Sequence, residues 1–74
     1  MWSVQVGAYS TKADADGAVT RLRTRGYDAR VDGSAAPWRV RFGLFPTRAA
    51  AADALERYKT RDKGTGFLVE VPRG

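Results

Sequence analysis

The sequence contains an internal repeat, in which residues 2–13 align with residues 38–49 at an offset of 36 positions. The identical pairs are Trp2/Trp38, Val4/Val40, Gly7/Gly43, Thr11/Thr47 and Ala13/Ala49. A repeat at a fixed offset carries information about architecture. Because each copy shows the alternation of a strand followed by the spacing of a helix, we expect one domain over residues 1–74. Its two halves would be the pseudo-repeat units 2–32 and 38–71.

The pattern of apolar residues predicts six elements in the order βαββαβ. Strands are expected over residues 2–8, 27–31, 38–44 and 67–71. Two helices lie between them, with N-caps at Thr11 and Thr47 and C-terminal glycines at Gly26, Gly64 and Gly66. Two βαβ units in this order usually interleave. The prediction is an α+β, ferredoxin-like (RNP-like) fold, with a four-stranded antiparallel sheet of order 4-1-3-2 and both helices on one face.

Composition excludes most catalytic chemistry. The 74 residues include no cysteine and no histidine, which removes disulfides, thiolate ligands, cysteine nucleophiles and the commonest general base. The sequence has no glycine-rich phosphate loop, no cluster of metal ligands and no serine with a nearby base. We therefore expect a binding module rather than an enzyme, with no cofactor and no metal. The net charge of +5, from ten arginines and three lysines against eight acidic residues, favours an anionic partner or reflects a solvated basic surface.

The sheet face opposite the helices is predicted to carry the ligand site. Strand alternation places on it Ser3, Gln5, Gly7, Arg39, Arg41 and Gly43 from the central strands, and Asp28, Arg30, Leu68 and Glu70 from the edge strands. Guanidinium forks suit carboxylates, phosphates and ring faces, and the Gln5 amide suits hydroxyls and amides. The two glycines would form a shallow floor for the ligand, or else mark bulges or a packing requirement. An ordinary solvated sheet face is the alternative for the polar residues.

Alternation also assigns the remaining side chains of the central strands. The helix side of the sheet is expected for Trp2, Trp38, Ala8 and Leu44. Tyr9 and Phe45 have the alternation of the open face, but each lies where its strand turns into a helix. We therefore expect both rings to fold back into the core, with ligand stacking as the alternative for the aromatic residues.

Two segments resemble the SPOR (sporulation-related repeat) domain family. Trp-Ser-Val-Gln-Val-Gly-Ala-Tyr at residues 2–9 resembles the family's Val-Gln-x-Gly-Ser-Phe, and Trp-Arg-Val-Arg-Phe-Gly-Leu-Phe at residues 38–45 is similar to its Tyr-Arg-Val-x-x-Gly-Pro-Phe. An alanine-rich helix follows each motif, and the resemblance runs from Trp2 to Val71. The family's glutamine and arginine correspond to Gln5 and Arg39, whereas its serine after the first glycine is Ala8 here.

The resemblance implies a partner and a location. SPOR domains bind bacterial peptidoglycan without catalysis, in particular glycan strands that amidases have denuded of stem peptides at the division septum. The site implied is the exposed sheet face, where we predict contacts from Gln5, Arg39, Arg41, Ser3, Gly7, Gly43 and Leu68. The implied location is the extracytoplasmic cell envelope. No apolar run approaches the ~20 residues that span a bilayer, so we expect no membrane insertion by this segment. Since the first strand starts at Trp2, without a targeting signal before it, we expect part of a longer envelope protein.

The main alternative is an RNA-binding module of the RRM type, which has the same element order and basic character. That module needs outward-facing aromatic residues on the first and third strands. Alternation turns Trp2, Trp38 and Phe42 inward, and the signature Lys/Arg-Gly-Phe-Gly-Phe is missing. We therefore expect no nucleic-acid partner. A ferredoxin-like regulatory module that dimerises through its sheet is a second alternative.

Overall fold

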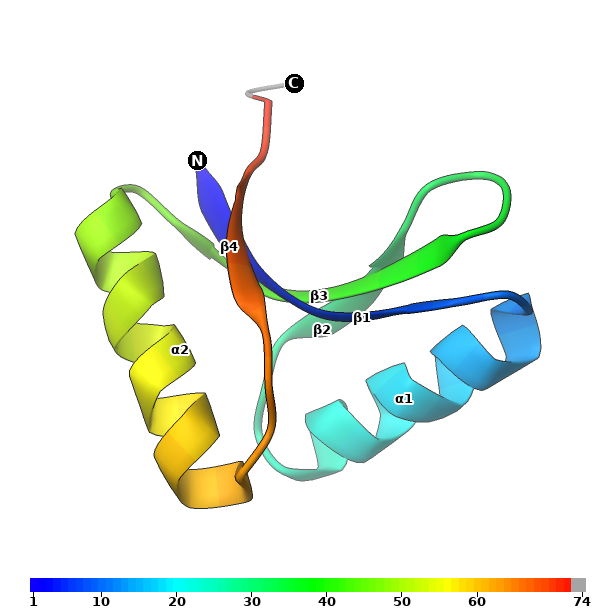
Figure 1. Ribbon diagram of the computed structural model, residues 1–74, viewed down its shortest axis with the longest axis horizontal. Helices are drawn as coiled ribbons and strands as arrows, with labels where there is room; N and C mark the ends of the chain where they lie inside the picture. The colour runs from blue at the N-terminus through cyan, green and yellow to red at the C-terminus, as the bar shows by residue number, and fades with distance from the viewer. Residues whose placement is uncertain (73–74) are drawn as a thin grey trace.

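The computed structural model describes residues 1–72 and has six elements in the predicted order (Figure 1). The strands are β1 (Trp2–Tyr9), β2 (Ala29–Asp32), β3 (Trp38–Phe45) and β4 (Phe67–Glu70), and the helices are α1 (Lys12–Thr24) and α2 (Arg48–Asp62). The strands form one antiparallel sheet of order β2-β3-β1-β4, which is the predicted order read from the other edge. The predicted fold is therefore confirmed. Residues 73–74 of the predicted domain lie outside the described residues.

Both helices cover the same face of the sheet, and the opposite face carries no helix (Figure 1). α1 packs mainly on β2 and β3, and α2 packs on β1, β3 and β4. Alanines on the inner side of both helices let the helix backbones approach the sheet closely. The buried apolar residues between the two layers are Val4, Ala15, Ala18, Val19, Leu22, Ala29, Val40, Phe42, Ala51, Ala54 and Leu55.

The helix boundaries follow from local capping. The hydroxyl of Thr11 accepts a hydrogen bond from the N–H of Asp14 at 3.3 Å, and that of Thr47 accepts one from Ala50 at 3.1 Å. Past α1, Gly26 takes a left-handed φ of 94°, as predicted. Past α2, the left-handed residue is Lys63 instead of the predicted Gly64. Gly64 is needed for a different reason, because a Cβ at this position would collide with the Tyr58 ring.

The C-terminal ends of the two helices are tied together by Asp62. Its carboxylate accepts hydrogen bonds from the guanidinium of Arg25, at 2.6 Å, and from the hydroxyl of Tyr27. Nη2 of Arg61 also donates to the carbonyl oxygen of Arg25 at 3.1 Å. The Tyr27 hydroxyl, followed by Arg25, lowers the pKa of Asp62, so this carboxylate is ionised at neutral pH.

Two β-bulges interrupt the pairing of β1 with β3. Between the pairs Trp2–Phe45 and Val4–Phe42 the extra residue lies in β3, and between Gln5–Arg41 and Gly7–Val40 it lies in β1. A bulge adds one unpaired residue, so the side chains beyond it change faces. Ala8 and Leu44 are consequently exposed, and the prediction that they face the helices is wrong. The prediction that Tyr9 and Phe45 fold back against the core is confirmed.

The glycines of the repeat make these bulges possible. Gly43 has a left-handed φ of 76°, and a Cβ there would lie 2.4 Å from the Phe45 ring. A Cβ at Gly7 would lie 3.2 Å from the Tyr9 ring. Each glycine therefore makes room for the aromatic residue two positions later to turn inward. Gly7 pairs with Val40, so the two glycines do not form the side-by-side floor considered from the sequence; bulge and packing explain both.

Candidate ligand-binding face of the sheet

One row of side chains crosses all four strands on the face that carries no helix. In register, Arg30 of β2 lies opposite Arg41 of β3, Arg41 lies opposite Gln5 of β1, and Gln5 lies opposite Phe67 of β4. Residues directly opposite in antiparallel strands have Cβ atoms ~5 Å apart. The four side chains therefore form a continuous band, which we call the cross-strand row. The next row on this face consists of Asp32, Arg39 and Ala8.

Asp32 organises the two arginines of the cross-strand row. Its Oδ2 accepts a hydrogen bond from Nη1 of Arg41 at 3.2 Å and lies 3.5 Å from Nε of Arg30. All three side chains are partly buried, which reduces the screening of this cluster by solvent. Because two guanidinium groups share a single carboxylate, the cluster keeps one positive charge.

Ser3 supports Arg30 and does not reach the surface. Its side chain has 0% exposure, its hydroxyl donates to the carbonyl oxygen of Phe42 at 3.0 Å, and it accepts from Nη2 of Arg30 at 3.2 Å. Nη1 of Arg30 donates to the carbonyl oxygen of Gly43 at 3.1 Å. The interpretation of Ser3 as a solvent-facing contact is therefore wrong, because Arg30 lies over it. Ser3 and Gly43 hold the Arg30 guanidinium in place.

Gln5 is fixed by Arg41 in one orientation of its amide. Nε of Arg41 donates to Oε1 of Gln5 at 3.0 Å, so the amide nitrogen points away from Arg41. Within residues 1–72 this nitrogen has no hydrogen-bond partner, and that range contains no side-chain nitrogen or oxygen that is both fully buried and unpartnered. Although Gln5 is only 8% exposed, its N–H donors therefore remain open to a ligand.

Arg39 carries the least restrained charge on this face. It is exposed and, among the residues that the structure describes, it has no ion-pair or hydrogen-bond partner. Its strand position places it one row from the cross-strand row, opposite Asp32 and Ala8. A guanidinium in this setting can form a bidentate contact with a carboxylate from outside the protein.

A groove adjoins the Phe67 end of the cross-strand row. It has a volume of about 470 Å³ and lies between residues 5–8 of β1 and residues 65–67. β4 pairs only with residues 2–5 of β1, which leaves the rest of β1 without a neighbour on that side. Gly66 passes so close to β1 that a Cβ there would lie 2.8 Å from the carbonyl oxygen of Gln5. The ring of Phe67, 55% exposed, stands beside this groove.

The structure corrects the alternation predicted for β4. Leu68 lies opposite the buried Val4 and packs against the core, so the prediction that it faces the open side is wrong. Phe67 takes the open side instead, and sequence reasoning missed it as a site residue. Residues 67, 68, 69 and 71 are all apolar, so hydrophobicity alone does not distinguish the two faces of this strand. The two faces are distinguished only by the register of β4 with β1.

The aromatic residues of β1 and β3 lie on the helix side. Arg48 of α2 stacks on Trp2, with its guanidinium carbon 5.8 Å from the ring centroid. The others pack against or within the core: Tyr9, Trp38, Phe42 and Phe45. An RRM-type interface uses aromatic rings that point outward from these two strands. In the described part of the chain, the only outward ring near the cross-strand row is Phe67, on β4.

Two other kinds of site are absent from residues 1–72. Neither helix in that range has the length and apolar character needed to cross a bilayer. The same residues contain no group of three or more acidic side chains placed to hold a metal ion.

The family profile of the SPOR domain matches residues 2–70. Among solved structures, the chain is similar to the peptidoglycan-binding domain of the B. subtilis cell wall lytic enzyme CwlC, determined in solution, with 26% sequence identity and a TM-score of 0.74. This similarity covers 93% of the present chain and 89% of the CwlC domain. A search of curated proteins gives no match. Because the family match extends from β1 to the end of β4, the protein belongs to the SPOR domain family.

Proposed function

We propose that this domain binds peptidoglycan through the helix-free face of its sheet, as a non-catalytic module of the extracytoplasmic cell envelope. Membership of the SPOR family supports the proposal, as does similarity to a peptidoglycan-binding domain of CwlC. The observation that carries it is the cross-strand row, in which Arg30, Arg41, Gln5 and Phe67 form one band over all four strands. Such a band can follow an extended polymer.

The ligand that fits best is a glycan strand denuded of stem peptides, as occurs at the division septum. Removal of the peptide leaves a free lactyl carboxylate on each muramic acid, so the strand becomes an anionic series of pyranose rings. Arg39 and the net positive cluster around Asp32 complement these carboxylates. The exposed ring of Phe67 offers a flat apolar surface for a sugar ring, and the amide N–H groups of Gln5 can donate to its oxygens.

Strands that keep their peptides would bind this face less well for two reasons. An attached peptide converts the lactyl carboxylate to an amide and so removes the charge that Arg39 would pair with. The peptide also adds bulk next to the sheet surface. Ser3 holds Arg30 and Asp32 holds Arg41 on this surface, so these two side chains are not free to move aside for the peptide. We therefore expect a preference for denuded strands, because intact strands lack the carboxylate charge and are also excluded sterically.

A pull-down with purified sacculi, before and after amidase digestion, tests this proposal. We expect more domain to be retained by digested sacculi, with retention reduced in Gln5→Ala and in Arg39→Ala. The matched control is Arg57→Ala, which removes an exposed arginine from α2 and should leave retention unchanged. Equal retention by intact and digested sacculi would contradict the preference for denuded strands. Unchanged retention in both sheet variants would contradict the location of the site.

A further inference from the structure

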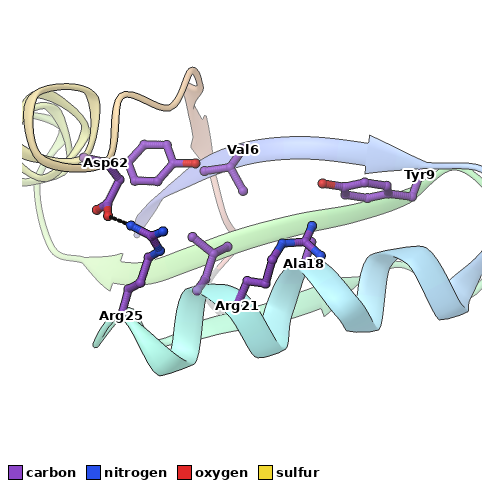
Figure 2. Close-up of a pocket in the computed structure, with 8 residues that line it drawn as sticks. Val6, Tyr9, Ala18, Arg21, Arg25 and Asp62 are labelled. Carbon is purple, nitrogen blue, oxygen red and sulfur yellow. Dashed lines mark hydrogen bonds and ion pairs between the residues drawn. The ribbon is translucent and has the colours of Figure 1, made fainter.

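A separate recess lies on the helix side of the sheet, between α1, β1 and the end of α2 (Figure 2). Its volume is about 220 Å³. The apolar part of its lining comes from Val6 of β1 and from Ala18 and Leu22 of α1. The remaining lining is polar, and it converges on the same space from all three elements.

Three hydrogen-bond donors in this recess have no partner within residues 1–72: the guanidinium of Arg21 and the hydroxyls of Tyr9 and Tyr58. In Figure 2 the ring of Tyr9 lies along β1 with its hydroxyl directed toward Val6, and Arg21 rises from α1 toward the sheet. Burial, then the charge of Asp62 and that of Tyr9, raises the pKa of Tyr58. Its hydroxyl therefore keeps its proton at neutral pH and remains a donor.

Asp62, the acidic residue of the recess, is already neutralised. Its carboxylate accepts from Arg25 at 2.6 Å, an ion pair that Figure 2 shows at the edge of the recess, and also from the hydroxyl of Tyr27. With Arg25 and Asp62 paired, the charge left to act on a ligand is that of Arg21. The recess is thus positive and rich in donors above an apolar floor.

The repeat supplies an internal comparison for this recess. A second recess, of about 500 Å³, contains the residues that lie 36 positions later for five of the lining residues: Phe42, Phe45, Ala54, Arg57 and Arg61. Both copies keep the two arginines, but Phe45 replaces Tyr9 and removes the hydroxyl. Arg61 is also occupied, because its guanidinium carbon lies 5.8 Å from the centre of the Tyr27 ring. The second recess keeps Arg57, which has no partner within residues 1–72, but the hydroxyl of its Tyr27 already donates to Asp62. Of the two recesses, the first therefore combines an unpaired guanidinium with unpaired hydroxyl donors.

We propose that the recess formed by Tyr9, Arg21 and Tyr58 binds a small aliphatic carboxylate. The planar fork of Arg21 matches the two oxygens of a carboxylate. The tyrosine hydroxyls supply further donors, and the apolar floor of Val6, Ala18 and Leu22 accommodates a short hydrocarbon group. Such a carboxylate occurs at the C-terminus of a short peptide and in a free organic acid. This site is independent of the ligand proposed for the opposite face of the sheet.

An NMR titration of the ¹⁵N-labelled protein tests the site, with four probes: propionate, alanyl-alanine, alanyl-alanine amide and inorganic phosphate. We expect saturable shifts of the amides of Tyr9, Arg21 and Tyr58 with the first two probes and none with the amide. A peptide terminus is the better source if alanyl-alanine binds more tightly, and a free acid is the better source if propionate does. Tighter binding of phosphate than of either carboxylate, or no saturable shift with either, overturns the proposal.

Variants separate this site from the rest of the protein. Arg21→Ala should weaken carboxylate binding by about tenfold, the loss expected for one charged hydrogen-bonding group, and Tyr58→Phe by a few-fold. Arg57→Ala changes the equivalent arginine of the second recess and should leave binding unchanged. Gln5→Ala should also leave it unchanged, so failure of the sheet-face function does not affect this result. An equal loss in Arg21→Ala and Arg57→Ala would show a nonspecific charge effect and overturn the site.

Discussion

Gln5 and Arg41 occupy equivalent positions of the repeat, and Nε of Arg41 donates a hydrogen bond of 3.0 Å to Oε1 of Gln5. They are also register partners in β1 and β3, so the pseudo-two-fold relating the two halves passes through this pair. Two arginines here would repel each other and lack an acceptor. Because the copies differ at this position, the axis carries a donor and an acceptor that fix each other on the open face.

Gln5 is expected to contribute to both stability and binding, and two variants separate these roles. Gln5→Ala removes the acceptor of Arg41 and should cost about 1 kcal/mol, the net value of a hydrogen bond. Gln5→Glu keeps an acceptor for Arg41 and should retain that stability, but it loses the N–H donors and adds a negative charge. Urea unfolding and sacculus pull-down check the two effects. Full glycan binding by Gln5→Glu would show that the amide donors are not used.

Phe67 is expected to contribute to binding far more than to stability. Phe67→Ala should reduce retention on amidase-treated sacculi, because the only outward ring of the cross-strand row is lost. Leu44→Ala is a matched control, since Leu44 is 52% exposed and Phe67 is 55% exposed, but Leu44 lies outside the row. Both variants should change the free energy of unfolding by less than ~1 kcal/mol. Equal retention of the two variants would show that Phe67 does not contribute to glycan binding.

Gly43→Ala should destabilise the fold through two separable effects. A non-glycine residue at a φ of 76° costs ~1–2 kcal/mol in backbone strain, and the new Cβ would also collide with the Phe45 ring, 2.4 Å away. Gly26→Ala is the control, because its φ is 94° but no atom lies within 4 Å of the added Cβ. Urea unfolding should show a larger loss for Gly43→Ala. Similar losses would mean that Phe45 shifts away without cost.

Stability is expected to fall in acid because of Asp62. Its pKa is lowered in the folded state, by the Tyr27 hydroxyl and then by Arg25, so folding favours the ionised form. The resulting stabilisation is present above the unfolded-state pKa of about 4 and is lost as the pH falls through the lower folded-state pKa. Urea midpoints at pH 6 and in strong acid should therefore differ more in the native protein than in Asp62→Asn. Parallel pH profiles for the two proteins would argue against this linkage.

The topology and the helix caps could be predicted from the sequence because they depend on local, periodic signals. Thr11, Thr47 and Gly26 act as predicted, and the repeat leads to the correct strand order. The face that each side chain of the central strands takes is predicted correctly as far as Val6 and Phe42. Beyond them alternation fails, since each bulge adds a residue that simple alternation does not count. The glycines of the repeat were themselves the signal, because a glycine inside a strand often marks a bulge.

The composition of the open face was harder to predict than its location. Gln5, Arg39 and Arg41 lie on it as expected, but burial of Ser3 under Arg30 depends on a contact between residues from different strands. Phe67 rather than Leu68 lies on the open face because of the register of β4 with β1, which pairs Gln5 with Phe67 and Val4 with Leu68. Neither of these long-range relationships leaves a periodic trace in the sequence.

NMR titration of the ¹⁵N-labelled domain with a peptide-free glycan oligosaccharide shows whether the open sheet face binds the glycan. We expect saturable shifts that cluster on the cross-strand row and at Arg39, with the amides of α1 and α2 largely unchanged. Shifts confined to the helices, with the amides of Gln5, Arg39, Arg41 and Phe67 unchanged at saturation, would contradict it.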